Sequence, residues 1–259
     1  MFARDNPGND SVSVPKISEV IARKIREEIL NAEMQPGDPI ASEAELITRF
    51  GASRPTVREA LRILESEQLV KIVRGINGGA RFTLPDIELV TQHLSVLLQA
   101  YGATQRDIMI ARIILEPPII GFVCKQANAD EIELLEQSIA LHKQASGDIR
   151  RFSQETERFY DYLQKISRNM LLSAILIITR QIMHTQTETL LEGMPSGDLF
   201  PKRNYENNIK AKETLLRHFR ERDSVEAEAI WRKHLSAQLR LAEHMGIADR
   251  RVTSISAEI

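Results

Sequence analysis

The chain has 259 residues, which is more than one typical domain and predicts two. With 5% aromatic residues, 12 glycines and 10 prolines, its composition favours a mainly helical protein over a β-sandwich. The single cysteine excludes an internal disulfide and is typical of a reducing compartment. No apolar run reaches the roughly 18–20 residues of a membrane span, and the N-terminus lacks the apolar core of a secretory signal. We therefore expect a cytoplasmic protein that does not enter a membrane.

The charge is unevenly distributed along the chain. The formal net charge of −2 argues against nucleic-acid binding only if the charges are spread evenly. Between positions 49 and 81, however, seven arginines and lysines stand against three glutamates, which leaves a local net charge of +4. This stretch is therefore where contact with DNA phosphates is expected.

Short helices are expected near the N-terminus. Apolar residues at helical spacing predict a first helix over residues 18–30. A second helix begins after Ser42, where a serine followed by Glu45 forms a capping box, and ends before Gly51. A third helix follows Ser53, its expected N-cap. Two helices joined by a short glycine turn, the second with a basic outer face, predict a helix-turn-helix.

A β-hairpin is expected after these helices. Residues 70–73 and 81–83 have the pattern of two short strands, and the tip between them is rich in glycine. Such a hairpin would form the wing of a winged helix-turn-helix. Residues 84–86 are the expected linker to the rest of the chain.

The DNA-contacting residues are expected at the start of the third helix and in the wing. Arginine can form paired hydrogen bonds with guanine, and the free N–H groups of a helix N-terminus can bind a phosphate. The alternative is an exposed basic face that contacts only water. The expected DNA-binding residues are Ser42, Ser53, Arg54, Thr56, Arg58, Arg74, Gly75 and Asn77.

These motifs resemble a known family. The run ASEAELITRFGASRPTVREALRILESEQLV, from Ala41 to Val70, resembles the DNA-binding domain of the GntR superfamily of regulators, and the similarity covers residues 16–83. Two positions differ from the usual pattern: Ala41 stands where proline is common, and Ala44 where an arginine often contacts DNA. The resemblance implies a transcriptional regulator whose operator sequence does not simply follow from the family.

The remainder of the chain has a helical pattern and predicts an antiparallel all-α bundle. The expected helices span residues 87–101, 104–126, 129–145, 148–166, 168–190, 203–222 and 223–246. This part is similar to the ligand-binding domain of the FadR branch of the superfamily, called the FCD domain. The residues that carry the similarity are 111–117 (ARIILEP), Phe152, Phe159, 167–169 (SRN), Arg222, Asp223, His234 and Leu235.

The expected domain organisation follows from both halves. We expect a disordered segment over residues 1–15, a winged helix-turn-helix over residues 16–84, an FCD-like effector-binding and dimerisation domain over residues 87–246, and a tail over residues 247–259. The fold class is therefore mainly α, with a small β-hairpin wing.

The resemblance also implies that a metal site has been lost. Many FCD domains hold a divalent metal with one aspartate and three histidines. At the matching positions this chain has Thr156, Tyr160, Lys212 and His234. A charged ammonium cannot be a ligand, and one histidine does not hold a metal. We therefore expect no metal and no other cofactor.

An anionic effector is expected in the same place. The resemblance puts Lys212 where the charge of the metal would lie, and Arg112 at the position of an arginine that faces a carboxylate. The alternative is that Lys212 extends to water and that the pocket is apolar. The remaining histidines, His142 among them, are interpreted as surface or satisfied core residues. The expected effector-binding residues are Arg112, Thr156, Tyr160, Asn208, Lys212 and His234.

The sequence thus predicts a repressor that binds a palindromic operator as a homodimer and whose operator affinity is controlled by a small anionic effector. The metal-free pattern favours a fatty acid or its acyl-CoA thioester, while sugar acids and other small carboxylates stay open. No glycine-rich phosphate loop, G-x-S-x-G or H-E-x-x-H motif is present, so we expect no enzyme. Two alternatives are a helical small-molecule-binding protein whose N-terminal domain contacts proteins, and a DNA-binding regulator without an effector.

Overall fold

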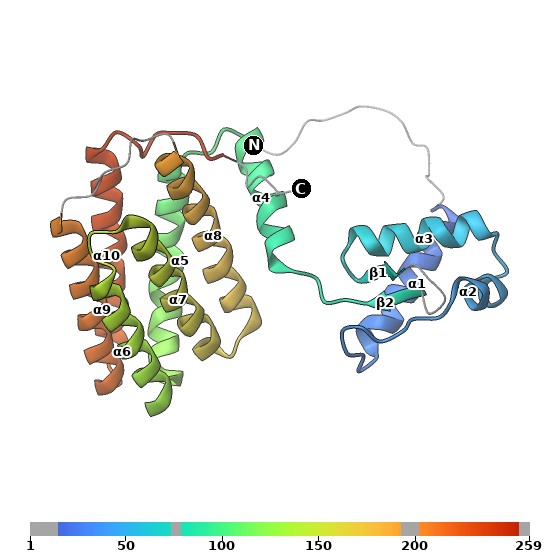
Figure 1. Ribbon diagram of the computed structural model, residues 1–259, viewed down its shortest axis with the longest axis horizontal. Helices are drawn as coiled ribbons and strands as arrows, with labels where there is room; N and C mark the ends of the chain where they lie inside the picture. The colour runs from blue at the N-terminus through green and yellow to red at the C-terminus, as the bar shows by residue number, and fades with distance from the viewer. Residues whose placement is uncertain (1–14, 74–78, 193–201, 254–259) are drawn as a thin grey trace. The chain divides into compact units, whose positions relative to one another are not determined.

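The computed structural model describes residues 15–73, 79–192 and 202–253. The chain divides into two compact units, Met1–Asp86 and Ile87–Ile259 (Figure 1). Within the described ranges there are ten helices and one two-stranded sheet, which confirms the mainly α fold class. None of the helices in these ranges is long and apolar enough to cross a membrane.

The N-terminal unit is three helices followed by a hairpin. Its elements are α1 (Ile17–Asn31), α2 (Glu43–Phe50), α3 (Arg54–Ser66), β1 (Val70–Val73) and β2 (Gly79–Phe82). The strands are antiparallel, with Val70 opposite Phe82 and Val73 opposite Gly79. This order of elements confirms the winged helix-turn-helix. Residues 1–14, for which the sequence predicts disorder, lie outside the described residues.

Local capping fixes the start of α2 and the turn between α2 and α3. The backbone N–H of Ser42 donates to Glu45 Oε2 at 2.7 Å, and the hydroxyl of Ser42 accepts from the N–H of Glu45. Gly51 ends α2 in the left-handed region at φ 59°, which a residue with a Cβ rarely adopts. Ser53 then caps α3 by accepting from the N–H of Thr56. These contacts set the direction in which α3 leaves the turn.

The apolar face of α3 holds this unit together. Val57, Ala60 and Leu64 of α3 are fully buried, and they pack with Leu46 of α2 and Ile25 of α1. Deleting a buried side chain of this size costs about 2–5 kcal/mol. The opposite face of α3 is free of core packing and is available for other contacts.

The C-terminal unit is an all-α bundle (Figure 1). Its helices are α4 (Ile87–Ala100), α5 (Gln105–Gln126), α6 (Ala129–Gln144), α7 (Ile149–Ser167), α8 (Met170–Glu192), α9 (Lys202–Glu221) and α10 (Ser224–His244). The helix α5 is central and packs against α7, α8 and α10, while α4 packs along α8. The core includes the fully buried Ile120, Leu163, Phe219 and Trp231.

A pair of prolines interrupts the hydrogen bonding of α5. Pro117 and Pro118 lie inside the helix, and neither can donate a backbone N–H. The carbonyl of Ile113, four residues before Pro117, therefore lacks its helical donor. Arg232 of α10 supplies one instead, since its Nη1 donates to the Ile113 oxygen at 2.9 Å. The break in α5 thus becomes a contact point with α10.

The segment after α10 packs onto the bundle. The N–H of Val252 donates to the Ala103 oxygen at 2.8 Å, and the N–H of Gln105 donates to the Arg250 oxygen at 2.9 Å. Val252 is buried, as is Ala248. At least up to residue 253, the expected tail is therefore part of the folded unit.

Candidate functional site

The N-terminal end of α3 presents polar and basic side chains at the surface. Ser53, Arg54 and Arg58 are exposed, and the Thr56 hydroxyl lies 2.7 Å from Ser53 Oγ. Ser42, at the start of α2, is exposed as well. These five predicted residues therefore lie at the N-terminal ends of α2 and α3. The other three, Arg74, Gly75 and Asn77, lie outside the described residues.

The arginines of α3 differ in their partners. Arg58 Nε lies 3.1 Å from both carboxylate oxygens of Glu43, whereas Arg54 has no ion pair within the described ranges. Arg62 is exposed and follows at the same helical spacing of four residues, so it shares the face of Arg54 and Arg58. Arg62 is not among the residues predicted to bind DNA, although its spacing from Arg54 and Arg58 is visible in the sequence.

A cavity of about 580 Å³ opens within the helical bundle. It is bounded by side chains of α5, α7, α8, α9 and α10. All six residues predicted to bind the effector line it: Arg112, Thr156, Tyr160, Asn208, Lys212 and His234. The structure thus brings together side chains from four helices that are far apart in the sequence.

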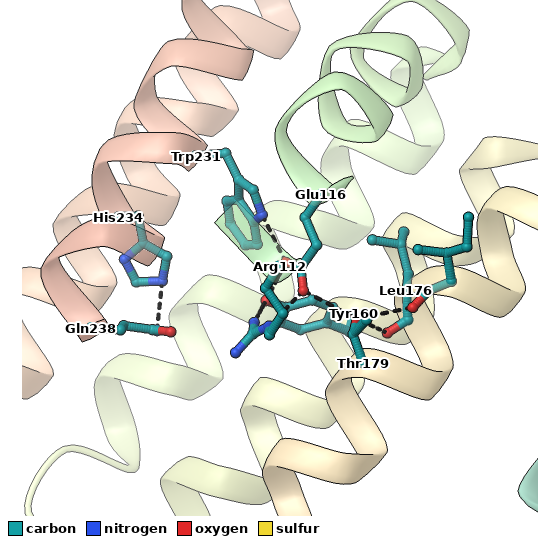
Figure 2. A network of polar contacts seen from close by, with 9 residues as sticks. Arg112, Glu116, Tyr160, Leu176, Thr179, Trp231, His234 and Gln238 are labelled. Atoms are coloured by element: carbon teal, nitrogen blue, oxygen red, sulfur yellow. Dashed lines mark hydrogen bonds and ion pairs between the residues drawn. The ribbon is translucent and has the colours of Figure 1, made fainter. Parts of the chain in front are cut away.

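A buried carboxylate organises one wall of this cavity (Figure 2). Glu116 is fully buried and accepts hydrogen bonds from Arg112 Nε at 2.6 Å, Trp231 Nε1 at 3.0 Å, and Tyr160 Oη and Thr179 Oγ1, both at 3.2 Å. Burial alone would lower the pKa of Arg112, but the charge of Glu116 keeps it raised. Arg112 and Tyr160 are therefore held in place by Glu116, which the sequence analysis did not single out. The spacing of four residues between Arg112 and Glu116 was the available signal.

A second basic residue on this wall is also paired. Arg180 of α8 forms an ion pair with Glu157 of α7. Burial, followed by the charge of Arg112, lowers the pKa of Arg180 to about 10. Two of the cavity's cations are thus matched by two carboxylates.

Lys212 is the buried basic side chain of this cavity without such a match. Its side chain is 1% exposed, so the alternative in which it extends to water is wrong. The Nζ atom lies 2.8 Å from His142 Nε2 and faces the rings of Phe159 and Phe152 at 5.0 and 5.7 Å. No ion pair with a carboxylate reaches it among the residues that the structure describes. Burial therefore places the pKa of Lys212 well below its usual value.

Neutral polar groups surround Lys212. His142 Nε2 also lies 3.0 Å from Thr156 Oγ1. Burial, followed by the charge of Lys212, lowers the pKa of His142 to about 2, and burial lowers that of His234 to about 3. His142 was interpreted as a surface or satisfied core residue; it is buried, and its contact with Lys212 could not be read from spacing.

Some residues that line the cavity carry unpaired polar atoms. Asn208 Oδ1, Asn204 Nδ2 and Arg180 Nη1 are buried without a hydrogen-bond partner in the described parts of the chain. Buried polar atoms in folded proteins are nearly always paired, so atoms of this kind are typical of a site that binds a ligand or water.

The side chains around Lys212 do not fit a divalent metal. In the described ranges, no three His, Cys, Asp or Glu side chains are grouped so that they could hold an ion. Lys212 offers a single nitrogen that already contacts His142 Nε2, and the Tyr160 hydroxyl donates to Glu116. A metal ion at this place would lie beside the basic side chains of Lys212 and Arg112, and no unpaired carboxylate of the described residues would compensate its charge.

The purified protein is therefore expected to contain no stoichiometric metal. Elemental analysis of protein prepared without chelators measures this directly, and added EDTA should leave the melting temperature unchanged. His234→Ala serves as the control and should leave the metal content unchanged. One zinc, nickel or manganese ion per chain would contradict this expectation.

Comparisons with known proteins agree with both units. The family "Bacterial regulatory proteins, gntR family" matches residues 17–77, and the FCD domain matches residues 107–237, half of the chain. The HTH-type transcriptional repressor NanR of Cronobacter sakazakii is 24% identical over 235 residues, which are 89% of this chain and 86% of that protein. The NanR repressor of Edwardsiella tarda is 27% identical, covering 86% of this chain and 84% of that protein.

A solved structure shares the fold. The GntR protein of Streptococcus agalactiae covers 87% of this chain and 100% of its own, with a TM-score of 0.65 and 22% identity. The two family matches together show that the chain belongs to the GntR family of bacterial regulatory proteins and carries an FCD domain.

Proposed function

We propose that this protein is a repressor that binds its operator through α3 and releases it when a small anion enters the cavity. The observation that carries the proposal is Lys212, a buried basic side chain that lines the cavity and has no carboxylate partner among the described residues. The relatives that it matches are repressors by name.

The DNA contact rests on the first turn of α3. The exposed Arg54 and Arg58 near its start suit a helix that enters the major groove. Arg58 would exchange or share its contact with Glu43 when it meets DNA. The predicted wing residues Arg74, Gly75 and Asn77 remain part of the proposal.

A twofold homodimer completes the arrangement. The helix α5 carries Ile110, Ile114 and Phe122 on its exposed side, at a spacing of four or eight residues along one face. Burying this face against a second copy would remove apolar surface from water. Two copies would then place two α3 helices about 34 Å apart on a palindromic operator.

Arg54→Ala is expected to weaken operator binding by about 5- to 150-fold, because the variant loses one arginine contact to a base. The operator is obtained by repeated selection from a random DNA library with the wild-type protein, and affinity is measured by gel shift at fixed salt. Arg217→Ala, which removes one exposed arginine of α9, is the matched control and should bind as the wild type does. If no sequence is enriched at low salt, the N-terminal unit contacts proteins and not DNA.

The charge and size of the cavity indicate the effector class. Glu116 and Glu157 neutralise Arg112 and Arg180, so Lys212 is the buried basic group left for a ligand. A volume of about 580 Å³ suits a drug-sized or smaller molecule. We favour a small monocarboxylate, either a short fatty acid or a sugar acid, over a whole acyl-CoA.

Lys212→Met is expected to abolish the release of operator DNA by such an anion. The test compares hexanoate, octanoate, D-glucuronate and octanoyl-CoA, reading DNA release by gel shift. Lys165→Met removes an exposed lysine of α7 outside the cavity and should respond as the wild type does. Equal release from the Lys212 variant would contradict this role, and release by none of the four compounds would favour a regulator without an anionic effector.

A further inference from the structure

The surroundings of Lys212 favour its uncharged form while the cavity is empty. His142 approaches from α6, Phe152 and Phe159 from α7, and the neutral imidazole of His234 lies on α10. An amine without charge can still donate one N–H to His142 Nε2 at 2.8 Å. Lys212 therefore needs no proton to keep this contact.

The charged groups near Lys212 do not supply a counter-ion. Arg112 of α5 is bonded to Glu116, and Arg180 of α8 is paired with Glu157 of α7. His184 of α8 also lies beside Glu157. Each carboxylate on the cavity wall thus already has a basic partner within the described chain. An ammonium at Lys212 would be a buried charge that nothing in this part of the protein compensates.

We propose that an anion enters the cavity together with one proton, which Lys212 takes up from solvent to form an ammonium–carboxylate pair. This inference rests on the proposed function and extends it, because the regulator would then respond to effector and pH together. No covalent bond changes: the ligand stays a carboxylate, and the proton moves from water to Lys212 Nζ.

The imidazole beside Lys212 is not the proton acceptor. His142 Nε2 lies 2.8 Å from Lys212 Nζ and 3.0 Å from the Thr156 hydroxyl, and it can accept from Lys212 only while it carries no proton. Protonating this nitrogen would remove the acceptor and place a second cation 2.8 Å from the first. His142 is therefore a positioning residue that holds Nζ toward the ligand.

The direction of the pH effect follows from linkage. A bound anion favours the ammonium and raises the pKa of Lys212 above its value in the empty cavity. Between these two pKa values each bound anion carries about one proton, so its affinity falls up to about tenfold per unit rise in pH. A divalent metal at this place would keep its charge and give no such dependence.

Calorimetry with hexanoate and D-glucuronate tests the proposal on the wild-type protein. Titrations between pH 6 and 9, each in two buffers of different ionisation enthalpy, count the protons taken up. We expect an uptake approaching one proton per bound anion and an affinity that decreases with pH. Binding without proton uptake and with constant affinity would overturn this inference and leave the proposed function standing. Absence of binding by both compounds would overturn both proposals.

Two variants identify the group that takes up the proton. His142→Gln keeps a hydrogen-bond acceptor but cannot titrate, so proton uptake should persist. Lys212→Arg keeps a charge that does not titrate in this range, so the anion should bind without uptake. Loss of uptake in the glutamine variant together with its persistence in the arginine variant would assign the proton to His142 and overturn the proposal.

Discussion

Replacing Glu116 with alanine is expected to destabilise the helical unit by about 3–5 kcal/mol, as breaking a buried ion pair commonly does. The variant leaves the Arg112 guanidinium buried without its carboxylate, and it removes the acceptor of the Trp231 indole N–H. Urea unfolding followed by circular dichroism and by fluorescence measures the loss. Trp231 is the chain's single tryptophan, so its emission reports this unit alone.

The matched control is Glu228→Ala. Glu228 pairs with Arg232 on the exposed side of α10, and a surface pair of this kind contributes at most about 1 kcal/mol. A Glu116 variant that unfolds at the same urea concentration as this control would contradict the structural role of the network.

Mild acid is expected to destabilise the helical unit well before it affects the N-terminal one. The pKa values of His142 and His234 lie near 2 and 3 in the folded chain, against 6.5 for the free side chain, mainly because of burial. Below pH 6.5 the unfolded chain therefore binds more protons than the folded one, and stability falls as pH falls toward 3. Two such groups change the free energy of unfolding by about 2.7 kcal/mol per pH unit.

The chain contains its own control for this prediction. All six histidines lie beyond residue 86, so the N-terminal unit has none and its carboxylates titrate only at lower pH. Hydrogen exchange of peptides from both units, compared at pH 7 and pH 5 after correction for intrinsic rates, separates them. Equal loss of protection in the two units would show that these histidines do not govern the acid response.

The helix caps and helix bounds could be predicted from the sequence, because they depend on residues that are close together along the chain. The capping box of Ser42 and Glu45, the left-handed Gly51 and the Ser53 cap depend on side chains that reach only three or four residues. The same holds for the helices of the bundle, whose expected bounds differ from the observed ones by a few residues at most. Local chemistry was sufficient for the fold class.

The interior of the site required the packed structure. Glu116 meets Trp231 and Thr179 because α10 and α8 both pack against α5. His142 meets Lys212 across 70 positions of sequence. The position of Lys212 in the sequence also cannot show whether its Nζ atom reaches water. In the structure the neighbouring helices bury this side chain.

Pro117 has a consequence for how the bundle is assembled. A fully hydrogen-bonded helix offers its neighbours only side chains, since its backbone is already satisfied. In α5 the missing donor leaves the Ile113 carbonyl open, and Arg232, 119 positions further on, recognises it. The free carbonyl of α5 therefore favours one register of α10 against α5. A slip of α10 by one turn would separate the Arg232 guanidinium from the Ile113 carbonyl and break this hydrogen bond.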